Sequence, residues 1–339
     1  AANGFCLRSL ECNFFAVEKL ENRVASGSGL SFFAQAMKNF TKHKLLFSHN
    51  CPGKEIYFKK SLSEVLFVVN EYCVKTASAY FHELPSSGSA VTDELLYGTR
   101  IFAVSPEKET ENWLCAETMY GYRGFVRKKD VRRKTGLQMS KSFVVTSPFC
   151  DILPKPEYKY KPLLTIPRGS KVVKNSSYSD VCGFTDIDFG GKVCYVRNSE
   201  IKPEEFEEDV TNPGAVRKNI VDTALLYLGT PYRWAGKSPS GIDCSGLCFQ
   251  SYAMNGLSLW RDAVPDSKYV KQISFSELKE ADLVYFKGHV VMYIGGGEYI
   301  HSSATLGGVV ISSFDKNSAV YYKKLDGGII MCARSVKLP

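Results

Sequence analysis

The chain has 339 residues, of which 44% are hydrophobic and 23% are charged, a composition typical of a globular protein with two or three domains. No apolar run in the sequence reaches the ~20 residues that a membrane-spanning helix needs. The formal net charge is +8, but the basic residues are dispersed and form no stripe with stacking aromatic side chains, which argues against nucleic-acid binding.

The first 73 residues are predicted to form a helical or mixed segment. Apolar residues recur at helical spacing within residues 28–47, and a second helix is expected over residues 61–73. We expect residues 1–73 to be an appendage that packs against the rest of the protein.

Residues 74–207 carry a strand-like pattern that occurs twice. Short strand-forming stretches alternate with glycine turns, and each copy ends on a strand that contains glycine, an aromatic residue and valine. The pattern predicts two small β-barrels, at residues 74–135 and 136–207. Their strands are expected at residues 74–80, 95–104, 113–116 and 122–126 in the first copy and at residues 143–146, 163–173 and 190–196 in the second.

The last domain is predicted to span residues 208–339. A charged linker, residues 202–209, leads into it. Its first helix is expected over residues 213–228, because apolar residues such as Ile220 and Ala224 share one face, and Gly229 would end that helix.

The Asp-Cys-Ser-Gly stretch at residues 243–246 carries the clearest chemical signal. A loop rich in Gly, Pro and Ser precedes it, and a helix-like run follows at residues 247–255 and stops at Gly256. Cys244 is therefore predicted at a helix N-terminus. There the helix dipole and the free backbone N–H groups favour a thiolate, the reactive form of cysteine.

Two histidines, His289 and His301, follow on strand-like runs. Antiparallel strands joined by the glycine turn at residues 295–297 would put both rings on one face. This arrangement predicts covalent hydrolysis, with Cys244 as nucleophile, His289 as general base and His301 as the group that orients the base. The opposing interpretation, a metal held by the two histidines, lacks further ligands at suitable spacing, so neither a metal nor a cofactor is expected.

The chain has eleven cysteines, an odd number, so at least one is unpaired in a monomer. Local disulfides could join Cys6 to Cys12, and Cys182 to Cys194 across a hairpin. The irregular spacing favours buried free thiols in a reducing setting over a disulfide framework.

Taken together, these motifs make the last domain resemble the NlpC/P60 cysteine peptidases, which cut peptidoglycan stem peptides. The resemblance runs from about Pro213 to the end of the chain and depends on residues 230–236, 243–246 and 282–286 and on the two histidine strands. With two barrels ahead of it, the layout resembles the subgroup that carries two N-terminal bacterial SH3 (SH3b) domains. The implied fold is multidomain α+β, with an N-terminal helical segment, two small SH3-like β-barrels and a papain-like α+β NlpC/P60 domain.

Enzymes of that subgroup are γ-D-glutamyl-L-diamino acid endopeptidases. The resemblance therefore implies a cysteine peptidase that hydrolyses the γ-D-Glu–diamino acid bond of stem peptides with a free N-terminal L-Ala, in turnover or recycling of cell-wall fragments. Such an enzyme would work as a monomer, without a cofactor, on peptidoglycan stem peptides and not on nucleic acid.

Two other functions and several properties stay open at this point. The same Cys-His set would suit a related thiol amidase or acyltransferase, and the SH3b domains would suit a non-catalytic cell-wall-binding protein. The chain begins at Ala1, and its sequence leaves open whether the protein is cytoplasmic or reaches the cell envelope through a leader absent from this chain. It also leaves the preferred diamino acid open.

The resemblance implies substrate contacts beside the nucleophile. Tyr232 would donate its hydroxyl to the oxyanion, alongside the backbone N–H of Cys244. Asp243, by position a helix N-cap, would also bind the α-amine of the substrate. Ser245 would hydrogen-bond the substrate or the backbone.

The resemblance also implies a wall supplied by the first barrel. That barrel would close one end of the cleft and direct an aromatic and an acidic side chain at the same amine. Tyr122 is the candidate aromatic group, and Glu94 or Glu83 is the candidate acid. Such a wall would limit the enzyme to released fragments, because an alanine linked to sugar has no free amine.

Three positions depart from the family pattern. Ala281 replaces the usual glycine before Asp282, Val291 replaces a glycine on the His289 strand, and Ala263 stands where the subgroup tends to have a substrate-binding serine. The catalytic residues are untouched, so these departures bear on substrate preference.

Overall fold

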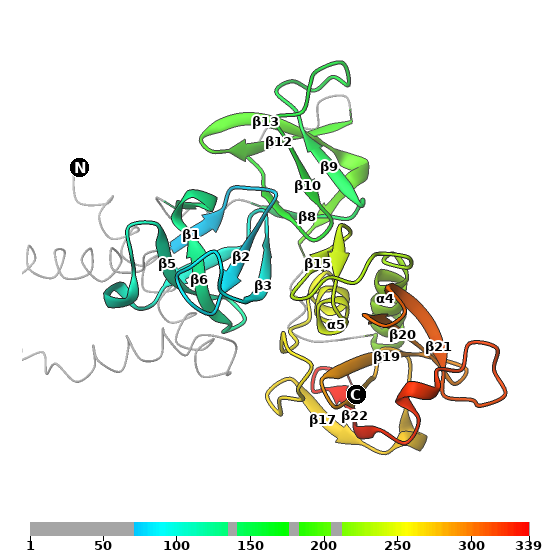
Figure 1. Ribbon diagram of the computed structural model, residues 1–339. Helices are drawn as coiled ribbons and strands as arrows, with labels where there is room; N and C mark the ends of the chain where they lie inside the picture. The colour runs from blue at the N-terminus through cyan, green and yellow to red at the C-terminus, as the bar shows by residue number, and fades with distance from the viewer. Residues whose placement is uncertain (1–70, 135–140, 176–182, 205–211, 339) are drawn as a thin grey trace, which may run out of the picture.

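The computed structural model describes residues 71–134, 141–175, 183–204 and 212–338, and in these ranges strands are many and helices few (Figure 1). The predicted segment 1–73 lies outside the described residues except for its last three positions. Three parts follow one another along the chain. They are called here the first sheet (residues 71–134), the middle sheets (the described residues of 141–204) and the C-terminal part (residues 212–338).

The first sheet has seven antiparallel strands in the order β3-β2-β6-β5-β4-β1-β7. Alternate side chains point into its core, where Phe81, Leu95 and Leu114 are fully buried. Its elements are β1 (Glu71–Val74), β2 (Ser78–His82), β3 (Val91–Leu96), β4 (Arg100–Ala103), η1 (Pro106–Lys108), β5 (Trp113–Thr118), β6 (Arg123–Arg127), η2 (Lys128–Asp130) and β7 (Val131–Arg133).

The start of the first sheet corrects the helix expected to end at residue 73. Residues 71–73 belong to β1, where Tyr72 pairs with Ile101 of β4 on one side and with Arg133 of β7 on the other. Strand pairing on both sides satisfies the backbone groups of β1, and this tertiary context overrides the helical spacing of the nearby apolar residues.

The middle sheets consist of three small antiparallel sheets in the orders β10-β9, β11-β8-β14 and β12-β13. Tyr97 of the first sheet joins their core, where its ring stacks on Phe189 with centroids 6.2 Å apart. The elements are β8 (Ser142–Val145), β9 (Phe149–Ile152), β10 (Leu164–Pro167), β11 (Lys171–Val173), β12 (Phe184–Phe189), β13 (Lys192–Arg197), η3 (Asn198–Glu200) and β14 (Ile201–Pro203).

The C-terminal part packs two helices against a six-stranded antiparallel sheet of order β17-β22-β18-β19-β20-β21. Leu283 and Val290 face the helices, whereas their neighbours Val284 and Val291 face a smaller apolar cluster on the other side. The elements are α4 (Pro213–Leu225), β15 (Lys237–Ser238), β16 (Gly241–Ile242), α5 (Cys244–Ala253), β17 (Val270–Ile273), η4 (Phe275–Glu277), β18 (Leu283–Phe286), β19 (His289–Gly295), β20 (Glu298–Ser303), β21 (Gly308–Ser313), η5 (Lys323–Leu325) and β22 (Ile329–Ser335).

Helix α4 begins as the sequence predicts, with Asn212 as N-cap and Pro213 in the first turn. It ends at Leu225 rather than at residue 228, because Arg168 of the middle sheets donates to the carbonyl of Leu226 over 2.8 Å and a turn follows. None of the described helices combines the length and the apolar character needed to span a membrane.

Ala281 adopts the left-handed backbone conformation, with a φ of 68°, and its side chain is fully buried. Glycine reaches this conformation without the steric cost that a Cβ carries. This conformation explains why the resemblance leads us to expect glycine before Asp282. The Cβ of Ala281 carries a steric cost there.

The three parts meet around β15 and α5 (Figure 1). The first sheet contacts the C-terminal part through backbone and side-chain bonds, among them Trp234 Nε1 to the Val91 carbonyl at 2.9 Å and Glu94 N to the Ala235 carbonyl at 2.9 Å. The middle sheets approach α5 at Gly169, where an added Cβ would lie 2.0 Å from Nε2 of Gln250. The helix that Cys244 begins is thus contacted by the middle sheets and lies near the contacts of the first sheet.

Candidate active site

Cys244 is the first residue of α5, as the sequence predicts. The side chain of Asp243 caps the helix by accepting from the backbone N–H of Gly246 over 2.6 Å. Gly246 has no room for a side chain, because a Cβ there would lie 2.2 Å from the carbonyl oxygen of Gly236. The Asp-Cys-Ser-Gly pattern therefore reflects a cap and a close crossing of two backbone segments.

The histidine rings lie on neighbouring antiparallel strands, His289 on β19 and His301 on β20. Nε2 of His289 is 2.9 Å from Nδ1 of His301, and Nε2 of His301 is 3.2 Å from Oγ of Ser312 on β21. The expected glycine turn and the shared face of the two rings are both present. Ser312 is a contact that sequence reasoning missed.

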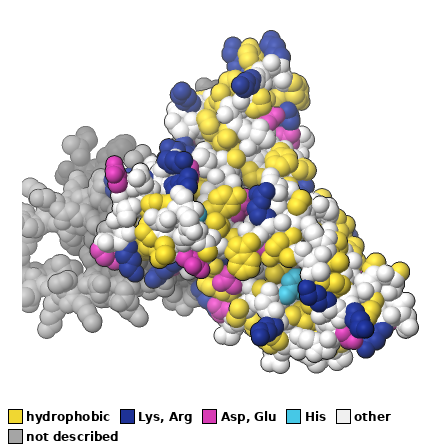
Figure 2. Space-filling view, in the orientation of Figure 1, with side chains coloured by type: hydrophobic (Ala, Val, Ile, Leu, Met, Phe, Trp, Pro, Cys, Tyr) yellow, Lys and Arg dark blue, Asp and Glu magenta, His cyan; other side chains and the backbone are white. Residues whose placement is uncertain are grey.

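The strands also bring the histidine pair to the nucleophile's helix. Val290, the residue after His289, shares a buried core with Cys244, and its backbone N–H bonds to the sulfur. His301 is fully buried, whereas His289 is partly exposed. Figure 2 shows a histidine at the surface with Lys or Arg side chains beside it.

Burial sets the protonation of this group. It raises the pKa of Cys244 to about 11, with the charge of Asp243 as the second cause. Burial, followed by the charge of Lys324, lowers the pKa of His289 to about 4, and burial lowers the pKa of His301 to about 3. Burial thus disfavours the thiolate at Cys244 and the charged form of both rings, and it opposes the helix N-terminus, which would favour the thiolate.

Asp243 has a partner that sequence reasoning missed. Arg261 donates from Nη1 to Oδ1 and from Nη2 to Oδ2 of Asp243, each over 3.1 Å, and from Nη1 to Oγ of Ser245 over 2.9 Å. Ser245 thus bonds side chains, where a contact with substrate or backbone was expected. The one available signal was the charged Arg-Asp pair at residues 261–262.

Tyr232 lies next to the nucleophile's loop. Its backbone N–H donates to the Gly307 carbonyl over 3.0 Å, and it forms an isolated bridge with Ile242. Burial, followed by the charge of Cys244, raises the pKa of Tyr232 to about 12, so the phenol keeps its proton at neutral pH. The hydroxyl is therefore available as a hydrogen-bond donor.

The acid beside Tyr122 differs from both acids expected and comes from the C-terminal part. The Tyr122 hydroxyl donates to Oδ1 of Asp262 over 3.0 Å, within the C-terminal part. Glu94 is instead buried and accepts from the backbone N–H of Lys237 over 2.7 Å and from Oγ of Ser238 over 3.2 Å. Glu83 is exposed in the turn after β2. The carboxylate of Glu94 is thus occupied by contacts between the first sheet and the C-terminal part, and the side chain of Glu83 is exposed to solvent.

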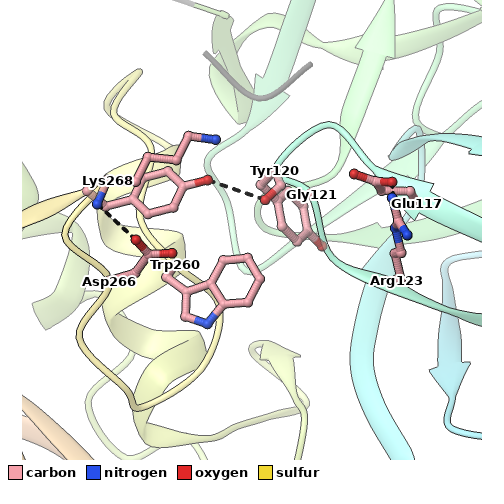
Figure 3. A pocket seen from close by; sticks show the side chains of 8 residues that line it. Glu117, Tyr120, Gly121, Arg123, Trp260, Asp266 and Lys268 are labelled. Carbon is pink, nitrogen blue, oxygen red and sulfur yellow. Dashed lines mark hydrogen bonds and ion pairs between the residues drawn. The ribbon is translucent and has the colours of Figure 1, made fainter. Parts of the chain in front are cut away.

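A cavity of about 240 Å³ lies where the first sheet meets the C-terminal part (Figure 3). Aromatic and charged side chains line it, and Cys244, His289 and His301 are not among them. The lining residues are Glu117, Tyr120, Gly121, Arg123, Trp260, Asp266, Lys268 and Tyr269.

Every cysteine that the structure describes is a free thiol. The two disulfides considered from the sequence involve Cys6, Cys12 and Cys182, which fall outside the described residues. Within the described ranges, no group of three or more His, Cys, Asp or Glu side chains is arranged to hold a metal ion.

Comparisons with known proteins agree with this geometry. Residues 229–326 match the model of the NlpC/P60 family. Dipeptidyl-peptidase 6 of Lysinibacillus sphaericus is 33% identical over 250 residues, which are 71% of this chain and 90% of the relative. Gamma-D-glutamyl-L-lysine dipeptidyl-peptidase of Bacillus subtilis is 25% identical over 250 residues, 70% of this chain and 80% of the relative.

A solved structure resembles the fold well beyond the C-terminal part. The crystal structure of an NlpC/P60 family protein from Bacillus cereus superposes with a TM-score of 0.63 at 21% identity. The superposition covers 79% of this chain and 100% of that chain, so the two proteins share a fold.

Proposed function

The chain belongs to the NlpC/P60 family, and we propose that it is a cysteine peptidase that hydrolyses the γ-D-Glu–diamino acid bond of peptidoglycan stem peptides with a free N-terminal L-Ala. The observation that carries the proposal is the 2.9 Å contact between His289 and His301 beside the helix that Cys244 begins. The names of the two relatives, both dipeptidyl-peptidases, support this substrate class.

The tautomers of the histidine pair follow from the role proposed for His289. For Nδ1 of His289 to accept the thiol proton, its Nε2 must carry a hydrogen and donate it to Nδ1 of His301. His301 is then protonated on Nε2 and donates to Oγ of Ser312. Ser312 and His301 together hold the base in its working tautomer.

The first half of the reaction forms a thioester. Nδ1 of His289 takes the proton from Cys244 as the sulfur attacks the γ-carbonyl carbon of D-Glu. The hydroxyl of Tyr232 and the backbone N–H of Cys244 donate to the oxyanion. His289 then gives its proton to the departing amine of the diamino acid, and the C–N bond breaks.

Water completes the reaction. His289 takes a proton from a water molecule that attacks the thioester carbonyl, the C–S bond breaks, and the sulfur recovers a proton from His289. The products are the L-Ala-D-Glu dipeptide and the peptide that begins with the diamino acid. Because thiol and imidazole start neutral, the proton transfer accompanies attack instead of preceding it.

The local charge favours a substrate amine. Asp93, Asp243 and Asp262 are near one another, and Glu94 also lies beside Lys237. Arg261 and Lys237 are the cations bonded to this group, so its acidic side chains outnumber them. Both oxygens of Asp243 already accept from Arg261, which leaves Asp262, beside Tyr122, as the carboxylate that we assign to the α-ammonium group. A cation at this position would offset the cost of burying the acids.

We also infer that the first sheet and the middle sheets are the two SH3b domains expected from the sequence. The seven antiparallel strands of the first sheet and the weak repeat between residues 74–135 and 136–207 support this. The contacts of Trp234 and Glu94 with β3 and β15 support a wall that closes one end of the cleft.

The decisive experiment is cleavage of L-Ala-γ-D-Glu-meso-diaminopimelate, with products identified by mass spectrometry. We expect the wild type to release L-Ala-D-Glu and Cys244→Ala to lose turnover entirely, because the thioester cannot form. Cys248→Ala is a matched control on the same helix, since Cys248 is also buried and the proposed mechanism gives it no step.

Other products would decide against the proposal. Release of alanine or transfer of the acyl group to an added amine would favour an amidase or an acyltransferase. Retention on insoluble peptidoglycan without turnover by the wild type would favour a wall-binding protein. Full turnover by folded Cys244→Ala would exclude the nucleophile assignment.

A further inference from the structure

Arg261 connects three segments of the chain that are distant in sequence. It lies between α5 and β17, and its side chain is 1% exposed. Nε donates to Oδ1 of Asp93 on β3 over 2.6 Å, while both terminal nitrogens reach Asp243. The guanidinium therefore links the first sheet to the residue immediately before the nucleophile.

The other oxygen of Asp93 is also held. Lys237 donates to Oδ2 over 2.9 Å, and the Tyr120 hydroxyl donates to it over 2.5 Å. Asp93 and the Lys237 side chain are almost completely excluded from solvent, and the ammonium group lies over the rings of Tyr120 and Phe249. Since every charge here has a partner of opposite sign, the arrangement is rigid and sensitive to the loss of any one member.

The hydrogen bonds around Asp243, beside Cys244, are equally constrained. Asp243 uses Oδ1 both to cap α5 at Gly246 and to accept from Arg261, and Ser245 bonds the same two side chains. Any shift of Arg261 must therefore move the cap, and with it the first turn of α5, where Cys244 lies.

We propose that Arg261 is a positioning residue for the reaction, held by Asp93 of the first sheet so that its fork fixes Asp243 and the first turn of the nucleophile's helix. The proposal rests on the proposed function and deepens it. The first sheet then acts on the sulfur through Asp93 and Arg261, in addition to any contact it makes with the substrate. A displacement of about 1 Å at a reacting group costs on the order of a hundredfold in rate.

The chain offers a matched control for the loss of a buried carboxylate. Asp282 is fully buried and accepts from Arg217 over 2.8 Å, from Arg334 over 2.9 Å and from the backbone N–H of Lys279 over 2.9 Å, and none of these partners caps α5. Asp282→Asn removes the same charge from a similar double ion pair. A general loss of stability would therefore affect it as much as Asp93→Asn.

The first test compares Asp93→Asn, Arg261→Lys and Asp282→Asn at a temperature where thermal unfolding shows all three to be folded. On the tripeptide, we expect Asp93→Asn and Arg261→Lys to lower kcat about tenfold to a hundredfold with KM changed less than about threefold. Asp282→Asn should stay within about twofold of the wild type. Equal kcat losses in Asp93→Asn and Asp282→Asn, or a folded Asp93→Asn with wild-type kcat, would overturn the proposal.

A second test needs no substrate and uses the rate at which iodoacetamide alkylates Cys244 at pH 8. Arg261→Gln leaves the charge of Asp243 uncompensated, so the thiol should ionise less and react several times more slowly, whereas Arg261→Lys keeps the charge and the rate. Equal rates in wild type and folded Arg261→Gln contradict the link to the sulfur. If the wild type fails to cleave the tripeptide, the proposed function falls, while this comparison still decides the role of Arg261.

Discussion

At the scale of single residues, the chemistry proposed for the site depends on whether Cys244 and His289 are charged or neutral before substrate binds. Burial acts on the sulfur of Cys244 and on the ring of His289 in the same sense, since it disfavours the charged form of each. The helix N-terminus and the backbone N–H groups of Ser245 and Val290 oppose this effect on the sulfur without overcoming it. Burial therefore favours the neutral thiol and the neutral ring over an ion pair.

A neutral thiol at Cys244 predicts that the rate of its alkylation rises with pH. The thiolate is the form that reacts with iodoacetamide, and below a pKa of about 11 its fraction rises with pH. We expect the alkylation rate of Cys244 to increase about tenfold per pH unit between pH 7 and 10. Mass spectrometry of the peptide containing Cys244 gives the rate, and circular dichroism at each pH checks the fold. A rate already constant at pH 7 would reveal a preformed ion pair instead.

At the scale of elements, the first turn of α5 is built by one close crossing. The loop at Gly236 passes over Gly246, and the cap from Asp243 closes the same turn. The antiparallel pair β19 and β20 then presents the histidines to this turn. The helix start, the cap and the histidine hairpin depend on residues close in sequence, which is why they were predictable. The crossing at Gly236 and the approach of the hairpin to α5 depend on how the chain packs.

Gly246→Ala tests the crossing. The new Cβ would lie 2.2 Å from the Gly236 carbonyl oxygen and 2.9 Å from Oδ1 of Asp243, so backbone must move. We expect the free energy of unfolding to fall by about 2 kcal/mol or more and the turnover of the tripeptide to fall with it. Gly214→Ala is the control, since it also lies in a first helical turn and its nearest neighbour is 3.7 Å away. Equal stabilities of the two variants in chemical denaturation would refute this explanation.

At the scale of the whole molecule, the described parts form a single arrangement around the nucleophile's helix. The first sheet supplies Asp93, Glu94 and Tyr122 to contacts with the C-terminal part. The middle sheets reach the same helix through Gly169 and hold the end of α4 through Arg168. Sheets that look like appended modules in the sequence thus contact the C-terminal part around the helix that Cys244 begins.

The wall that we propose the first sheet forms predicts that cleavage depends on a free α-amine in the substrate. Acetylation removes the positive charge that Asp262 and Tyr122 are proposed to receive and adds bulk where the first sheet closes the cleft. We expect kcat/KM for N-acetyl-L-Ala-γ-D-Glu-meso-diaminopimelate to be about a hundredfold lower than for the free peptide. Asp262→Asn should lose most of this discrimination. Similar values for both peptides with the wild type would exclude the wall as an amine site.

The sequence by itself determined the local features of this protein. Asp243 as a cap, Cys244 at a helix start and the hairpin that pairs His289 with His301 depend on neighbours within a few residues or on one turn, and the order of these motifs indicated the family. The expected helix was wrong at residues 71–73, which strand pairing places in β1, and the end of α4 was wrong where Arg168 bonds the carbonyl of Leu226.

Only the tertiary structure decided which acid faces Tyr122, that Arg261 joins Asp243 to Asp93, and that burial raises the pKa of the Cys244 thiol. Asp93 and Arg261 are 168 positions apart, and Tyr122 and Asp262 are 140 apart. Contacts at such separations and the degree of burial arise from how the parts pack together. Neither the spacing of residues nor their local propensities encodes that packing in a form that can be read from one chain.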